Sequence, residues 1–247
     1  MPTFDRPDRP AGVRISDVKC GESVRHKTVG ETIMHVAAIS DLHGHLPAIP
    51  PCDLLLIAGD ICPVRDHSLR SQIAFLDGPF RKWLAEIPAR HVVGIAGNHD
   101  LLFELDPDRV PRDLRWTYLL DSAVEIHGLS VYGTPWQPRF FDWAFNLDEP
   151  ELAKQWEMIP AGTDILICHG PPHGFGDKTV RGDSAGSPSL LEAIRRVRPR
   201  LAVFGHIHEG RGQWTLDVEG TRVRLANASL VDERYRPAHG PIQFEIP

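Results

Sequence analysis

Five short apolar runs recur along the chain, and each of them is followed at once by Gly, Asp, Asn or His. They cover residues 34–40, 53–58, 91–96, 164–168 and 201–204. Near-continuous apolar runs of about five residues are typical of strands that are buried on both faces, since a half-exposed strand would alternate with polar residues. Sheets built from such strands are covered by helices. We therefore expect an α/β fold.

The segments between and after these runs have the periodicities of helices and of half-exposed strands. Apolar residues at helical spacing predict helices over residues 68–87, 149–158 and 188–198, and Gly78-Pro79 is expected to break the first of them in two. Alternation predicts a hairpin over 123–134 and antiparallel strands over 213–219, 222–229 and 241–246. Residues 1–33 are polar and punctuated by Pro and Gly, which favours an N-terminal extension or a peripheral strand before one domain at 34–247.

Composition excludes several classes of protein. The chain has 247 residues, 42% of them hydrophobic and 24% charged, so it can bury a core and is neither disordered nor collagen-like. Its apolar runs are shorter than the roughly 20 residues that a membrane-spanning helix needs. The first ten residues carry charges and prolines where a signal peptide has an apolar stretch. We therefore expect a cytoplasmic protein with no membrane partner.

Charge and cysteine content narrow the choice of ligand. A net charge of −6 disfavours long nucleic acid as the main partner, but it allows a small phosphorylated substrate held by metal ions. The sequence leaves monomer and homodimer open. The four cysteines, Cys20, Cys52, Cys62 and Cys168, have no C-x-x-C spacing, which disfavours a thiolate zinc site or a disulfide framework. Metal bound by any of the 13 histidines would therefore need oxygen ligands as well.

Metal-capable side chains follow all five of the apolar runs. In open α/β sheets, ligands bind beyond the carboxyl ends of the strands, where loops bring distant residues together. One Asp or His after a strand is ordinary, but five such coincidences indicate a site. The residues are Asp41, His43, Asp60, Asn98, His99, Asp100, His169, His206 and His208.

The donor types indicate the kind of metal. Imidazoles, carboxylates and an amide oxygen without thiolate suit first-row ions such as Mn, Fe, Zn or Co, whereas calcium and magnesium sites are built from oxygen alone. Seven ligands are too many for one tetrahedral ion and fit two ions that share a carboxylate. Two ions about 3.5–4 Å apart form the clamp that is used for in-line displacement at phosphorus.

The motifs D-x-H, G-D, G-N-H-D, H-G and G-H-x-H, over roughly residues 34–230, resemble those of the calcineurin-like metallophosphoesterase superfamily. The chain also resembles its MPPED-type subfamily, whose members are cyclic-nucleotide phosphodiesterases or nucleotide binders. The cues are the segments Pro135–Pro138, Trp143–Leu147, His169–Pro172, Gly205–Gly210, Asn227–Ser229 and Pro241–Phe244. The resemblance implies a four-layer α/β/β/α sandwich of two mixed sheets, with a dinuclear metal site at the carboxyl ends of the strands.

The resemblance also implies roles for the site residues. One ion would be held by Asp41, His43 and His208, the other by Asn98, His169 and His206, and Asp60 would bridge the two. His99 would lie beside the substrate phosphate and protonate the leaving oxygen, while Asp100 would hold the His99 ring. Asn98, His99, His45 and His173 are the candidates for binding substrate.

These roles imply a phosphodiesterase that acts on small, including cyclic, nucleotides through a metal-bridging hydroxide. Two alternatives stay open: a phosphomonoesterase or phosphoprotein phosphatase, and a nucleotide-binding protein with low residual catalysis. Arg181 and Arg211 are candidates for gripping a second phosphate, and the remaining histidines, His67 among them, are interpreted as structural. The candidate platform for a nucleobase is the aromatic cluster Trp136, Phe140, Phe141, Trp143 and Phe145.

Overall fold

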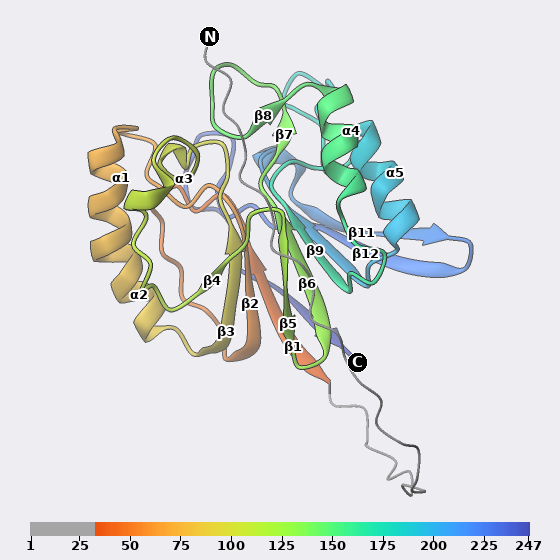
Figure 1. Ribbon diagram of the computed structural model, residues 1–247, viewed down its shortest axis with the longest axis horizontal. Helices are drawn as coiled ribbons and strands as arrows, with labels where there is room; N and C mark the ends of the chain where they lie inside the picture. The colour runs from red at the N-terminus through yellow and green to blue at the C-terminus, as the bar shows by residue number, and fades with distance from the viewer. Residues whose placement is uncertain (1–32) are drawn as a thin grey trace, which may run out of the picture. The chain divides into compact units, whose positions relative to one another are not determined.

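Two β-sheets form the centre of the protein in the computed structural model, which describes residues 33–247 (Figure 1). The first sheet has the strand order β13 (Ile242–Ile246), β1 (Met34–Ile39), β2 (Cys52–Ala58), β3 (Ala89–Ile95) and β4 (Thr117–Tyr118). The second has the order β11 (Gly212–Val218), β12 (Thr221–Asn227), β10 (Leu201–Phe204), β9 (Ile165–Cys168), β6 (Leu129–Thr134) and β5 (Ser122–Ile126). The five apolar runs are thus the buried strands β1, β2, β3, β9 and β10.

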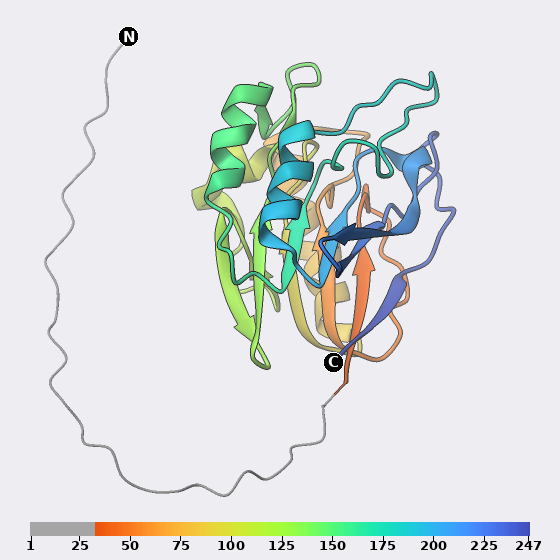
Figure 2. The same cartoon turned by 90° about the vertical axis from the view of Figure 1, so that its right-hand side faces the viewer.

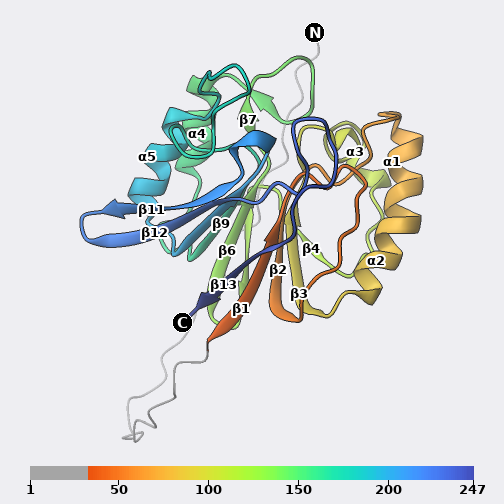
Figure 3. The same cartoon turned by 180° about the vertical axis from the view of Figure 1, so that it is seen from behind.

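Both sheets are mixed. In the first, β1 to β4 are parallel and β13 is antiparallel to β1, beside which it lies in Figure 3. In the second, β6, β9, β10 and β12 are parallel, and the edge strands β5 and β11 are antiparallel. The segment predicted as an antiparallel strand over 222–229 is therefore antiparallel to β11 and parallel to β10. The last residues of β12 are buried rather than half exposed, because this strand lies between β11 and β10 inside the sheet.

Helices cover the outer face of each sheet. The helices α1 (Leu69–Phe75), α2 (Arg81–Glu86) and α3 (Leu101–Leu105) lie on the first sheet. The helices α4 (Glu149–Glu157) and α5 (Pro188–Val197) lie side by side on the second, as Figure 2 shows. The four layers follow from alternation along each buried strand. In β2, Leu55 and Ile57 face the helices, whereas Leu54 and Leu56 pack between the sheets against β9 and β10.

The first predicted helix differs from its prediction at Gly78-Pro79. It is not broken there: α1 continues through a π-helical turn (Leu76–Phe80) directly into α2. A wider turn can accommodate Pro79, which has no N–H to donate and would clash within a regular α-helix. The helices predicted over 149–158 and 188–198 are confirmed. Ser187 caps the latter by accepting a hydrogen bond from the backbone N–H of Leu190 at 3.1 Å.

The short elements are ones that the sequence patterns did not predict. Besides α3 and β4, they are the 3-10 turns Pro107–Arg109 and His208–Gly210 and the two-stranded ribbon of β7 (Gln137–Pro138) and β8 (Asn146–Leu147). Within residues 33–247, no helix has the length and apolar character needed to cross a bilayer. Cys52, Cys62 and Cys168 are buried free thiols. The predictions made for residues 1–32 lie outside the described part of the chain.

Candidate metal centre

The predicted site residues come together where the parallel strands of both sheets end. Asp41 and His43 follow β1, Asp60 follows β2, and the segment 98–100 follows β3. His169 follows β9 of the second sheet, and residues 206–208 follow β10. The two sheets therefore contribute to one cluster, and most of its side chains are almost fully buried.

The loops that carry these side chains have unusual backbone conformations. Asp41, His43, Asp60 and His206 all have positive φ, between 45° and 68°, although none of them is glycine. Such conformations cost free energy and persist where surrounding contacts fix them. Here the N–H of Asp41 donates to the carbonyl of Gly59 at 3.1 Å, and the N–H of His43 donates to the carbonyl of Asp60 at 2.8 Å. The strand-end loops thus hold one another in place.

Two glycines of the motifs are required by close approach of the backbone to the site. A Cβ atom on Gly97 would collide with the carboxylate of Asp60, and one on Gly205 would collide with that of Asp41. The G-N and G-H pairs are therefore packing requirements of the site, since any side chain at these positions would displace a carboxylate.

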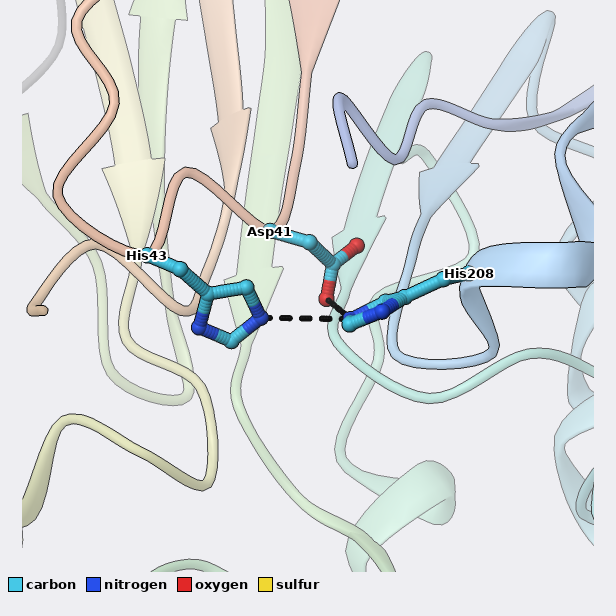
Figure 4. Close-up of side chains that lie close together, drawn as sticks. All are labelled: Asp41, His43 and His208. Carbon is cyan, nitrogen blue, oxygen red and sulfur yellow. Dashed lines mark hydrogen bonds and ion pairs between the residues drawn. The ribbon is translucent and has the colours of Figure 1, made fainter. Parts of the chain in front are cut away.

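The Asp41 half of the site consists of Asp41, His43 and His208, which point toward one another (Figure 4). Nε2 of His208 lies 3.5 Å from Oδ1 of Asp41 and 3.2 Å from Nε2 of His43. The buried hydroxyl of Ser229 donates to Oδ2 of Asp41 at 2.5 Å, and this hydrogen bond holds the carboxylate in place. Nδ1 of His208 faces the carbonyl of Asp232 at 3.1 Å, so its Nε2 is directed to the cluster.

The Asn98 half consists of Asn98, His169 and His206. The amide oxygen of Asn98 lies 2.9 Å from Nε2 of His169 and 2.9 Å from Nδ1 of His206. Nδ1 of His169 lies 2.8 Å from the carbonyl of Ala58, which directs Nε2 inward. Three donor atoms from three loops therefore converge on one point.

Asp60 lies between the two halves. Its Oδ2 is 3.7 Å from Nε2 of His43, and its Oδ1 is 3.5 Å from Nε2 of His169. Oδ1 also accepts a hydrogen bond from the backbone N–H of His99 at 2.8 Å. Each oxygen of this carboxylate thus faces a different half, which is the geometry required of a shared ligand.

Burial and charge set the protonation of the site histidines in opposite directions. Burial lowers the pKa of His43 to about 3, against the charges of Asp60 and Asp41. Burial and the charge of His169 lower the pKa of His206 to about 3. Burial disfavours protonation of His169 too, but the charge of Asp60 and its hydrogen bond prevail and raise the pKa to about 9. His43 and His206 are therefore neutral, with a ring lone pair available.

The carboxylates are held in their charged form. Burial alone would raise the pKa of Asp41, but the hydrogen bond and charge of His208 outweigh it and lower the pKa. The charges of His169 and His99 likewise hold the pKa of Asp60 well below its ordinary value in spite of burial. In return, Asp41 raises the pKa of His208 against the effect of burial. Both aspartates are therefore ionised at neutral pH and could serve as anionic ligands.

The donor set fits two metal ions. Three sets of donor atoms lie within 4.8 Å of one another: Asp41 with His43 and His208, Asp41 with Asp60 and His169, and His43 with Asp60 and His99. Nδ1 of His43 is buried and has no hydrogen-bond partner among the described residues, an exception to the rule that buried polar atoms are paired. Nitrogen and oxygen donors without thiolate suit first-row ions.

His99 lies beside this cluster, but Asp100 has a different position from the one predicted for it. The Asp100 carboxylate accepts hydrogen bonds from the backbone N–H groups of Ile61, Cys62 and Gly97 at 2.8–3.1 Å. Asp100 therefore links the loop after β2 to the loop after β3. The prediction that it holds the His99 ring is wrong. Backbone N–H groups donate to both oxygens of the carboxylate, and the hydrogen-bond contact of the His99 ring is with His67 instead.

Two side chains near the cluster were not predicted as site residues from the sequence. His67, interpreted there as structural, has its Nε2 3.1 Å from Nδ1 of His99. The ring of Tyr235 packs edge-on against His43 and His208, with centroid distances of 4.8 and 5.0 Å. His67 stands seven residues after Asp60, and this proximity to the G-D motif is a weak sequence signal that it belongs to the site. Tyr235 lies in a polar loop whose sequence gives no such signal.

The candidate substrate-binding residues His45 and His173 differ in how close the structure places them to the cluster. Nε2 of His45 faces the carbonyl of Tyr235 at 3.3 Å, and His173 is half exposed beside Asp177. In the aromatic cluster, Phe145 is buried and Trp136 donates to Asp121 at 2.9 Å, so both belong to the core. The aromatic residues near the metal centre are Phe140, 6.2 Å from the His206 ring, its neighbour Phe141, and Trp143, 4.3 Å from the His99 ring, measured between centroids.

Among the described residues, the guanidinium groups of the two candidate arginines make no hydrogen bond to the cluster. Arg211 donates to the carbonyls of Ser229 and Gly240 at 2.7 and 2.9 Å, so it supports the backbone behind the site. Arg181 is exposed on the loop between β9 and α5. Two of the five N–H donors of Arg211 are used in this way, so the expectation that Arg211 grips a second phosphate stays a prediction.

Comparison with known proteins decides the family. The calcineurin-like phosphoesterase family matches residues 34–210, a span that contains every member of both halves. The chain belongs to this family. It is 36% identical over 238 residues to human metallophosphoesterase domain-containing protein 1, covering 85% of this chain and 70% of that protein. It is 34% identical over 245 residues to a UPF0046 protein of Caenorhabditis elegans, covering 88% and 82%. The predicted resemblance to the superfamily and to MPPED-type proteins is confirmed.

Solved structures agree with this fold. The crystal structure of TT1561 from Thermus thermophilus superposes with a TM-score of 0.51 at 16% identity, covering 86% of this chain and 99% of that one. Membership of the calcineurin-like phosphoesterase family supports metal-dependent hydrolysis of phosphoesters at a site for two ions. The converging Asp41 and Asn98 halves are the part of the chain that can provide such a site.

Proposed function

We propose that this phosphoesterase hydrolyses phosphodiester bonds of small nucleotides, cyclic ones included. The observation that carries the proposal is the convergence of two three-residue halves on Asp60, with His99 and the exposed ring of Phe140 beside them. The Asp41 half and the Asn98 half would each hold one first-row ion, Mn, Fe, Zn or Co, and Asp60 would contact both. When bound, such ions neutralise charge on phosphoryl oxygens and make water a better nucleophile at neutral pH.

His99 is the residue suited to the leaving group. As water forms its bond to phosphorus, the bond from phosphorus to the leaving oxygen breaks and its electron pair goes to that oxygen. An alkoxide is a poor leaving group, so a proton delivered in the same step lowers the barrier. A ring nitrogen of His99 lies within 4.8 Å of donor atoms of His43 and Asp60. It is therefore close enough to the cluster to donate that proton.

Aromatic side chains support a nucleotide as the organic part of the substrate. Phe140 is 52% exposed and Phe141 is 74% exposed, although large apolar side chains are usually covered. Phe140 lies next to His206 of the Asn98 half, so a base bound over it would place its phosphate near the cluster. Stacking on such rings is worth about 1–3 kcal/mol per base and accepts any base.

The position of Arg211 favours a diester over a monoester. A monoester carries one more negative charge than a diester, and arginine is the residue best suited to clamp it. Two N–H groups of Arg211 donate to backbone carbonyls, which restrains the side chain from turning toward a phosphate at the cluster. The net charge of −6 agrees with a small substrate rather than long nucleic acid.

A substrate panel tests the proposal. Protein loaded separately with Mn, Fe, Zn and Co is assayed on bis(p-nitrophenyl) phosphate, 2′,3′- and 3′,5′-cyclic nucleotides, and p-nitrophenyl phosphate. We expect turnover of the diesters, with a higher kcat/KM than for the monoester. Replacing both Phe140 and Phe141 with Ala should raise KM for a cyclic nucleotide about tenfold while leaving kcat unchanged. Absence of diester turnover by fully metallated protein, or a preference for the monoester, would contradict the proposal.

A further inference from the structure

The two rings of His67 and His99 form a pair beside the metal centre. Nε2 of His67 lies 3.1 Å from Nδ1 of His99, which is a hydrogen-bond distance. The rings are close to parallel, with an interplanar angle of 28° and centroids 5.2 Å apart. Because Nδ1 of His99 is engaged in this contact, Nε2 is the nitrogen left to meet a substrate.

Trp143 supports the pair from the side. Its ring lies 4.3 Å from the His99 ring and 4.8 Å from the His67 ring, measured between centroids. A large, partly buried ring that touches both imidazoles limits the rotation of each about its side-chain torsions. The contact between the histidines is therefore part of a packed group of three rings.

The backbone fixes the two histidines relative to each other. His67 directly precedes Ser68, the residue that caps the N-terminus of α1 by accepting a hydrogen bond from Ser71 at 3.2 Å. Within α1, the fully buried Gln72 donates to the carbonyl of His99 at 2.7 Å and accepts from the N–H of Leu102 at 2.8 Å. One side chain thus joins the beginning of α1 to the loop that carries His99.

We propose that His67 is the positioning residue for His99, accepting the Nδ1–H hydrogen bond that orients the ring and fixes its tautomer. This rests on the proposed role of His99 as proton donor. With a proton held at Nδ1 by His67, the proton that leaves is the one on Nε2, and His99 returns to the neutral Nδ1–H form after the transfer. The carboxylate of Asp100, occupied by three backbone N–H groups, is not available for this task.

The activity test compares leaving groups. The p-nitrophenolate of bis(p-nitrophenyl) phosphate leaves without a proton, whereas the ribose oxygen of a cyclic nucleotide needs one. We expect His67→Ala to lower kcat on a cyclic nucleotide about 10- to 100-fold, the usual effect of removing the partner of a functional imidazole. The same variant should change kcat on the p-nitrophenyl diester less than about threefold. His67→Gln, whose amide oxygen can accept from Nδ1–H, should recover most of the loss.

Matched variants separate this inference from the proposed function. His91 also contacts a second histidine, His127, at a centroid distance of 5.1 Å, but it lies at the opposite end of β3, so His91→Ala should have no effect on either substrate. His99→Ala should reproduce the leaving-group selectivity of His67→Ala with a larger loss. Unselective loss in His99→Ala would overturn the proton-donor role, whereas selective loss there without selective loss in His67→Ala would overturn the inference about His67.

A second readout does not depend on activity. Two-bond proton–nitrogen NMR spectra of histidine-labelled, metal-free protein in mildly alkaline buffer report the tautomer of each neutral ring. We expect His99 to be in the Nδ1–H form in the wild type and in His67→Gln, and to shift toward the Nε2–H form in His67→Ala. Separate samples of the three proteins that are loaded with metal should bind equal amounts of it. An unchanged tautomer in His67→Ala would overturn the inference even if the protein hydrolysed none of the substrates.

Discussion

The Asp41 half and the Asn98 half of the metal centre are alike in their histidines. Each contains one imidazole that burial keeps neutral, His43 and His206 respectively, both with a pKa of about 3. Each also contains one imidazole whose pKa the neighbouring aspartates raise, His208 and His169. A neutral ring presents a lone pair at once, whereas a protonated ring must first lose its proton. The two halves therefore offer similar imidazole chemistry.

The third donor distinguishes the halves. In the Asp41 half it is a buried carboxylate that Ser229 and the backbone N–H of His206 hold in place. In the Asn98 half it is a neutral amide oxygen. Since Asp60 is shared, the Asp41 half has one full negative charge more than the Asn98 half. We expect the Asp41 half to bind its ion more tightly, because ligand charge count is a main determinant of metal affinity.

Removal of the shared carboxylate of Asp60 should cause both halves to lose their metal ion, so that their difference in metal affinity disappears. Asp60→Ala takes one oxygen from each half, so we expect the loss of both ions and a fall in kcat/KM of about a thousandfold or more. Elemental analysis of the purified variant measures the metal, and diester hydrolysis measures the rate. Asp53→Ala, at the other end of β2, is the control and should retain both ions. Loss of one ion alone would show that Asp60 serves only one half.

Metal binding should also depend on pH in both halves, since the pKa of His208 is raised in the Asp41 half and His169 has a pKa of about 9 in the Asn98 half. An ion in the Asn98 half must displace the His169 proton at neutral pH, so affinity should fall about tenfold per pH unit below the pKa, or about 100-fold from pH 8 to pH 6. His43 and His206 lose no proton in this range, because their pKa values are about 3. Titration calorimetry with Zn or Mn in buffers of different ionisation enthalpy measures the released protons. Heats that do not depend on the buffer would contradict the prediction.

Much of the fold and the cluster could be predicted because both depend on local patterns. The buried strands are apolar throughout and the helices have clear spacing, so their positions follow from periodicity. The cluster follows from topology, since parallel strands of one sheet end at one edge and carry Asp41, Asp60 and Asn98 there. Glycine at positions such as Gly97 and Gly205 has a direct reason, the closeness of a carboxylate.

The remaining features depend on contacts that no periodicity encodes. The positions of His67 and Tyr235 result from how loops pack, and loops carry no repeating signal. Asp100 directly follows His99, but adjacent residues in a turn point in different directions, and its carboxylate is used by backbone N–H groups. Pro79 predicts a helix break because a regular helix excludes it, whereas a π turn supported by tertiary packing does not. Propensity is overridden there by the burial of Leu76 and Phe80.

Exchanging the carboxylate of Asp41 and the amide of Asn98 between the two halves should also exchange their metal affinities. Asp41→Asn removes a charge from the Asp41 half and should weaken its ion about tenfold, while Asn98→Asp adds a charge to the Asn98 half and should strengthen its ion by a similar factor. The double variant keeps the net charge of −6 and should hold the same number of ions as the wild type, with the tighter one now in the Asn98 half. Competition with a chelator gives the two dissociation constants, and thermal unfolding of each metal-free protein checks that the fold is retained. If the order of the two constants stays the same in the double variant, the halves differ for a reason other than the charge of the third donor.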